Sequence, residues 1–103
     1  MNVLNSKTYE ENLPCGSLYL TFCFNGGEKP KKIIVQVGRA GQCLRSWSDA
    51  ISRTINLYLQ NNGDLEELAK ELRHIRCDKV LPNPEKPKSC ADAIAKIIEE
   101  FIG

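Results

Sequence analysis

Hydrophobic and polar positions alternate most regularly in the segment 18–24. Alternation with a period of two is typical of a strand and places the larger apolar side chains on one face. These side chains are Leu18, Leu20, Phe22 and Phe24. The segment 25–32 contains two glycines and a proline, which predicts a turn, and the apolar run 33–37 follows it. The pattern therefore predicts an antiparallel β-hairpin with one face to be covered.

Three helices are predicted after the hairpin, because apolar positions then recur at steps of three and four. The longest starts near Cys43, ends near Asn61-Asn62-Gly63 and is expected to be the central core helix. Asn and Gly tolerate the left-handed backbone found just past helix ends. The predicted inner face of this helix consists of Trp47, Ala50, Ile51, Thr54, Ile55, Tyr58 and Leu59.

The two later helices are predicted to begin at residues that cap helix N-termini. Asp64 precedes a short helix, and Glu67 stands three residues on, as in a capping box. Ser89 precedes a helix that is predicted to continue to the end of the chain, and three prolines in the segment 78–88 predict an exposed loop between the two helices. The predicted fold class is α+β, with an antiparallel β-hairpin packed on a long central helix and two further helices in two layers.

Length and composition narrow the class of protein. The 103 residues fit one domain, with residues 1–12 expected as a weakly ordered lead-in and residues 13–103 as the domain. Fourteen basic and thirteen acidic side chains leave a net charge of +1, so electrostatics favour neither nucleic acid nor a membrane surface as partner. Apolar runs are too short to span a membrane and the start resembles no signal peptide, so a cytoplasmic location is expected.

Five cysteines are the main candidates for chemistry. Cys23 lies within the predicted strand and is interpreted as a small hydrophobic residue. The other four lie at the ends of predicted elements: Cys15, Cys43, Cys77 and Cys90. Helix N-termini favour the thiolate form at two of them, and four thiolates can hold a structural Zn²⁺. No C-x-x-C pair is present, so a shared zinc site and separate buried or reactive thiols both stay open.

Two further features of the sequence are candidate sites. The turn Gly38-Arg39-Ala40-Gly41 stands between a strand and a helix, where it is either a tight turn or an anion site with Arg39 as charge partner. His74 is the only histidine and is interpreted as a cap at a helix end. A Cys-His nucleophilic pair also needs a carboxylate that orients the histidine, and the sequence places no such cysteine and carboxylate around His74. A self-contained catalytic site is therefore not expected.

The ordered motifs resemble one family. They are Pro14-Cys15-Gly16, Gly38 to Cys43, Ile75-Arg76-Cys77 and Ser89-Cys90-Ala91-Asp92. This set resembles the TSCPD domain, a C-terminal module of cobalamin-dependent ribonucleotide reductases that also occurs as short stand-alone proteins. The signature pentad stands here as Lys88 to Asp92, without its first Thr and its Pro. The resemblance implies a small accessory or regulatory module, with neither reductase catalysis nor a cobalamin site in this chain.

The resemblance also bears on the candidate residues. All four edge cysteines stand at motif positions of the family, which favours a zinc or thiol site, and the candidate ligand-binding residues are Gly38, Arg39, Gly41, Ser89 and Asp92. Two alternatives are a redox-active thiol protein that serves a reductase, and nucleotide or phosphate binding at the turn from Gly38 to Cys43. A reductase or a nucleotide is the expected partner, and the edges of a hairpin suggest a homodimer.

Overall fold

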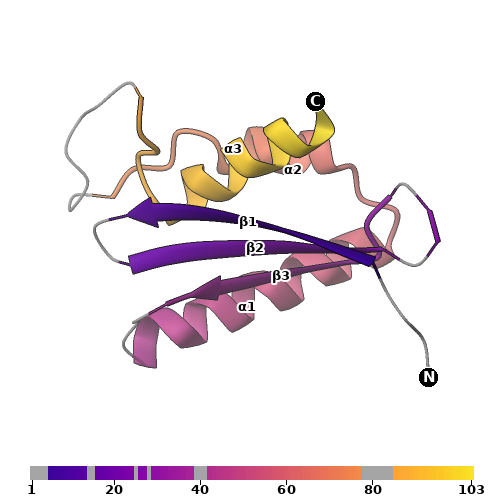
Figure 1. The fold of residues 1–103 in the computed structure, drawn as a ribbon, viewed down its shortest axis with the longest axis horizontal. Helices are drawn as coiled ribbons and strands as arrows, with labels where there is room; N and C mark the ends of the chain where they lie inside the picture. Colours follow the sequence, from indigo (N-terminus) through magenta and orange to yellow (C-terminus); the bar gives the residue numbers. More distant parts are fainter. Residues whose placement is uncertain (1–4, 14–15, 25, 28, 39–41, 78–84) are drawn as a thin grey trace.

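The computed structural model describes residues 5–13, 16–24, 26–27, 29–38, 42–77 and 85–103. This part of the chain forms a three-stranded antiparallel sheet of order β1-β2-β3 and three helices. The elements are β1 (Asn5–Leu13), β2 (Gly16–Phe24), β3 (Lys32–Val37), α1 (Gln42–Gln60), α2 (Leu65–Leu72) and α3 (Cys90–Ile102). The predicted α+β class is confirmed, and the predicted hairpin corresponds to β2 and β3 (Figure 1).

The first strand is the element that the sequence pattern does not predict. The structure pairs β1 with β2 over its whole length, from Asn5 opposite Phe24 to Leu13 opposite Gly16, where the pattern predicts only a weakly ordered lead-in. Polar residues dominate β1, and its apolar Tyr9 and Leu13 are only partly buried, so its sequence carries little strand signal. β1 is therefore a strand because it pairs with the strongly apolar β2, and its own sequence shows little strand preference.

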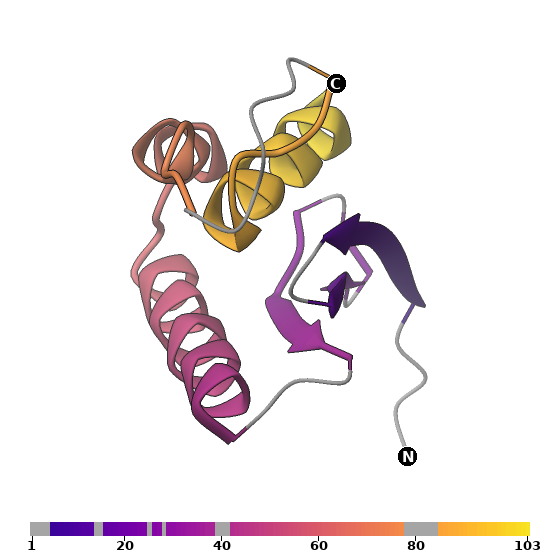
Figure 2. The same ribbon diagram turned by 90° about the vertical axis from the view of Figure 1, so that its left-hand side faces the viewer.

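Helix α1 closes the edge of the sheet at β3. The main-chain N–H of Ile33 donates to Oδ1 of Asn56 at 2.8 Å, and the main-chain N–H of Val35 donates to Oγ of Ser52 at 2.8 Å. An edge strand leaves such donors without a neighbouring strand, and a covering helix is one way to satisfy them. Figures 1 and 2 show α1 running beside β3 along this edge.

The inner face of α1 differs in part from the prediction. Ile55 is buried, and three other predicted residues pack against the core: Trp47, Ile51 and Leu59. The prediction is wrong for Ala50 and Thr54, which are exposed. Polar Ser52 and Asn56 face the sheet instead, because their side chains take up the main-chain donors of β3.

The most deeply buried helix is α3, which lies over the apolar face of the sheet beside α2 (Figure 2). Its buried residues are Asp92, Ala93, Ile94, Ala95, Ile97 and Ile98. The rings of Phe101 and Phe22 stack with centroids 4.1 Å apart and planes 8° from parallel. The centre of the core thus lies between β2 and α3, and α1, the expected central helix, flanks it.

The connection from α1 to α2 follows the predicted signals with one change. Asn62 adopts a left-handed backbone with φ of 62°, and Oδ1 of Asp64 accepts the N–H of Glu66 at 3.0 Å as the N-cap of α2. The hydroxyl of Tyr58 accepts the Asp64 N–H and donates to the Asp64 carbonyl, both at 2.9 Å. The capping box predicted with Glu67 is therefore replaced by a contact with Tyr58.

Candidate functional site

The segment Ser89-Cys90-Ala91-Asp92, which resembles the family signature, leads into α3. The Ser89 hydroxyl oxygen accepts the N–H of Asp92 at 3.0 Å, which confirms the predicted N-cap. The same hydroxyl donates to the main-chain carbonyl of Ile75, in the segment that follows α2. Ser89 is only 5% exposed. One buried hydroxyl therefore starts α3 and also ties the α2–α3 connection to it.

Asp92 is the second anchor of this connection. Its side chain is 0% exposed, Oδ1 accepts the His74 N–H at 2.8 Å, and Oδ2 accepts the Lys88 N–H at 2.8 Å. Burial by itself would raise the pKa of Asp92, but these two N–H groups, with the positive charge of Lys96 3.6 Å away, outweigh it and lower the pKa. At neutral pH the carboxylate is ionised and holds the segments on either side of the connection together.

Two of the four predicted cysteines belong to this anchored region. The main-chain N–H of Cys77 donates to the carbonyl of Lys88 at 2.9 Å, and Cys90 is the first residue of α3, two positions after Lys88. Both cysteines are half-buried. The hydrogen bonds of Ser89 and Asp92 therefore hold the main chain near Cys77 against the start of α3, where Cys90 lies.

Of the other two predicted cysteines, the structure describes one. Cys43 is exposed in the first turn of α1, and Cys15 lies outside the described residues. Gly16 explains the glycine of the Pro14-Cys15-Gly16 motif, because its φ is 136° and a Cβ there would lie 2.5 Å from the carbonyl oxygen of Gly38. The described glycines of two motifs, Gly16 and Gly38, thus meet where β2 begins and β3 ends.

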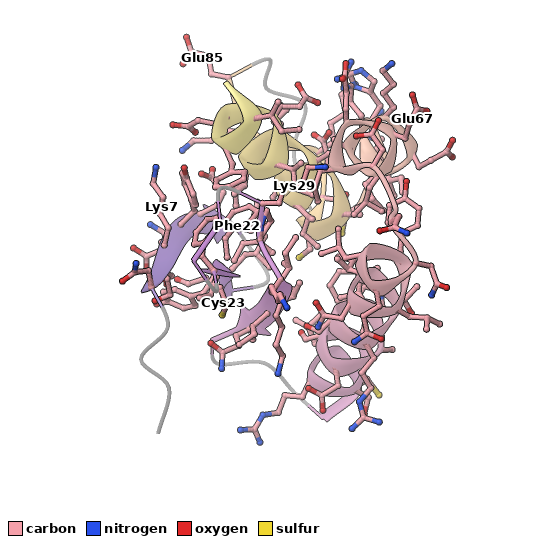
Figure 3. The ribbon with its side chains drawn as sticks, turned by 90° about the vertical axis from the view of Figure 1, so that its right-hand side faces the viewer. Lys7, Phe22, Cys23, Lys29, Glu67 and Glu85 are labelled. Carbon is pink, nitrogen blue, oxygen red and sulfur yellow. The ribbon has the colours of Figure 1, made fainter. Side chains whose placement is uncertain are left out.

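Cys23 is separate from these positions. It lies in β2 with a strand register opposite to that of Leu18, Leu20 and Phe22, and Figure 3 shows it on the sheet away from the helices. Over the described ranges, no group of three or more His, Cys, Asp or Glu side chains is arranged to hold a metal ion. Because Cys15 is outside those ranges, the four-cysteine zinc site stays a prediction.

Of the predicted ligand-binding residues, the structure describes Ser89 and Asp92 at the start of α3 and Gly38 just after β3. Ser89 and Asp92 use their polar atoms in the internal bonds described above, and their ligand-binding role stays a prediction. Gly38 donates its N–H to the carbonyl of Ser17 at 2.8 Å, whereas Arg39 and Gly41 lie outside the described residues. A hollow of about 640 Å³ lies between the end of β3 and the start of α1. Its lining consists of Val35, Gln36, Val37, Arg45, Ser46, Ser48 and Asp49.

His74 contributes through its backbone as well as its ring. Its φ of 68° is left-handed, it follows the C-cap Arg73 of α2, and its N–H reaches Asp92. Its ring Nδ1 lies 3.0 Å from Nζ of Lys88. The sequence predicts His74 as a residue at a helix end. It does not predict that the main-chain N–H groups of His74 and Lys88 donate to Asp92. Main-chain donors are common to all residues other than proline, so nothing in the sequence singles these two out.

The fold and this anchored connection define a small α+β domain whose signature residues organise the start of its last helix. The TSCPD domain model matches residues 2–102, and the chain belongs to the TSCPD domain family. Membership relates the chain to a domain of ribonucleotide reductases. No match was found among curated proteins or among solved structures. Within the described ranges, no helix combines the length and apolarity needed to cross a membrane.

Proposed function

We propose that the chain is a small accessory or regulatory binding module whose cysteines form a structural zinc or thiol site. The observation that carries this proposal is that the signature residues Ser89 and Asp92 form internal hydrogen bonds with the α2–α3 connection. Both are buried and spend their side-chain oxygens on holding the Cys77 segment against the start of α3. Because the side chains of Ser89 and Asp92 are taken up by these internal bonds, a site at this position would be formed by the side chains beside them. In the signature motifs these are the thiols of Cys77 and Cys90.

The chemistry of such a site follows from its position. The start of α3 presents main-chain N–H groups that favour an anionic thiolate at Cys90, and thiolate is the form that binds Zn²⁺. Cys77 would supply a second ligand, and Cys15 and Cys43 the others. The contact of Gly16 with Gly38 supports this set, because it brings the motif containing Cys15 to the turn that leads to Cys43. A tetrahedral site of four thiolates would join three connections of the fold.

Metal content tests the zinc form of the proposal. Protein purified under reducing conditions should contain about one zinc per chain, and Cys77→Ser and Cys90→Ser should lose it. Cys23→Ser is the matched control, because Cys23 lies on the opposite face of the sheet, and it should keep the metal. Zinc below about 0.1 equivalent in the wild type, with unchanged melting in a chelator, would remove the zinc form.

Alkylation kinetics near neutral pH separate a thiol site from a redox-active one. A redox role in serving a reductase requires one thiol, Cys43 or Cys90, to react much faster than Cys23 in the same chain. A structural site requires Cys77 and Cys90 to react slowly until the protein is denatured. Uniformly fast reaction of all thiols in the native protein would contradict a structural site.

Phosphate or nucleotide binding at the Gly38 turn is the second candidate, favoured by the hollow beside it. Arg45 in this hollow supplies a positive charge next to the first turn of α1, where main-chain N–H groups attract anions. A panel of nucleotides and inorganic phosphate should then raise the melting temperature of the wild type and not that of Arg45→Gln. A panel without any thermal shift in the wild type would end this candidate.

A further inference from the structure

The outer edge of β1 differs from the opposite edge of the sheet. At β3, side chains of α1 take up the outward N–H groups, as described above. At β1, the elements that pack on the strand are β2 on one side and α3 on one face, and no helix or strand lies beyond its outer edge in Figure 2. Within the described chain, β1 therefore presents a nine-residue edge to solvent.

The register shows which main-chain groups point outward from β1. Ile33 and Val35 direct their N–H groups away from β2, so their partners in β2, Phe22 and Leu20, direct theirs toward β1. The residues opposite these in β1 bond inward to β2. The alternate residues of β1 therefore present their N–H and C=O groups at the open edge: Ser6, Thr8, Glu10 and Asn12.

We propose that this edge pairs with the same edge of a second copy of the chain, antiparallel about a two-fold axis at Tyr9. In this register Lys7 of each chain stands opposite Glu11 of the other, so two ion pairs form across the interface. Thr8 stands opposite Glu10, and the outward main-chain groups of one copy meet those of the other. The result is a continuous six-stranded sheet with the helices of both copies on one face.

The charges of β1 select this register over its neighbours. Only registers that match outward groups with outward groups are allowed, so the axis moves in steps of one residue. An axis at Glu10 would set Glu10 against Glu10, and like charges directly opposite destabilise a sheet. An axis at Thr8 would set Lys7 against Tyr9 and leave Glu11 without a cation. Among these three, only the Tyr9 axis sets opposite charges, Lys7 and Glu11, across from each other without placing like charges opposite.

The position of Lys7 fits this role. Lys7 is exposed, Figure 3 places it at the outer margin of the sheet, and its Nζ lies 5.5 Å from the ring centroid of Tyr9 in the same chain. A lysine on an edge strand by itself opposes pairing with another strand. Here Glu11 stands four residues on, at the position that neutralises Lys7 when the second strand is a copy of the first.

Sedimentation equilibrium of single and double charge variants tests the proposal. The wild type should be a dimer, and Lys7→Glu and Glu11→Lys should each weaken dimerisation by at least about tenfold, because each sets two like-charge pairs across the axis. The double variant, with Lys7→Glu and Glu11→Lys together, restores both ion pairs and should recover the wild-type dissociation constant. Dimerisation can recover in the double variant only if residues 7 and 11 face each other across the interface. A general effect of charge on solubility would not produce this recovery.

Thr8→Pro supplies an independent test of the main-chain bonds. The N–H of Thr8 points away from β2, so proline should leave the monomer folded by circular dichroism while removing two bonds across the axis. The proposal is overturned if the wild type is monomeric up to about 100 μM, which would leave the edge to a strand of another protein. It is equally overturned if the dimer persists unchanged in the single charge variants and in Thr8→Pro.

Discussion

Replacing Asp92 by asparagine probes the anchor at the start of α3. Each carboxylate oxygen accepts one main-chain N–H at 2.8 Å, and the side chain is 0% exposed. Asparagine keeps one acceptor and turns an NH₂ group toward the other N–H, so one amide of His74 or Lys88 loses its partner. An unsatisfied donor of this kind costs about 1–3 kcal/mol, and the bond that remains loses its charge-assisted part. We expect Asp92→Asn to lower the free energy of unfolding by about 2–4 kcal/mol.

Urea unfolding followed by circular dichroism measures this loss. For a domain of this size, the change corresponds to a melting temperature lower by roughly 10–20 °C. Asp49→Asn is the matched control, because Asp49 is an exposed aspartate on α1, and it should change stability by less than about 0.5 kcal/mol. If Asp92→Asn falls within the same range as the control, the anchoring role derived from the hydrogen bonds is refuted.

The pH dependence of stability gives a second readout of Asp92. Its pKa in the folded protein is lowered, so the ionised carboxylate stabilises the fold at neutral pH. This contribution begins to disappear as the pH falls below the unfolded value of about 3.9 and is lost as it passes the lower folded value. The stability difference between wild type and Asp92→Asn should therefore shrink below about pH 4. A difference that stays constant from neutral pH into this range would contradict the assigned cause.

Two other substitutions test the packing of the sheet. Gly16→Ala should destabilise the protein by at least about 2 kcal/mol, because the new Cβ would meet the Gly38 carbonyl oxygen at a positive φ; Gly27→Ala, which meets open space, is the control in the same thermal melts. Asn56→Ala should cost about 1 kcal/mol and speed hydrogen exchange of the Ile33 amide relative to amides of α3, since that amide loses its acceptor. Unchanged exchange at Ile33 would show that water replaces the side chain without loss.

Elements with a strong local signal could be predicted from the sequence. The alternation in β2 places Leu18 and Leu20 on one face because neighbouring side chains of a strand point to opposite sides, and both are fully buried. Asp64 and Ser89 were predicted as N-caps because their short polar side chains reach N–H groups two or three residues on. Each of these predictions depends on neighbours close in the chain.

The tertiary structure alone decided the features whose partners are distant in sequence. β1 becomes a strand because β2 pairs with it, and Asn56 faces inward because the edge of β3, 23 residues earlier, presents a donor to it. Asp92 appears in the sequence as a residue of a helix start, whereas its role comes from His74, 18 positions away. A polar side chain has no preferred side until its hydrogen-bond partner is in place, and for these residues the fold provides that partner.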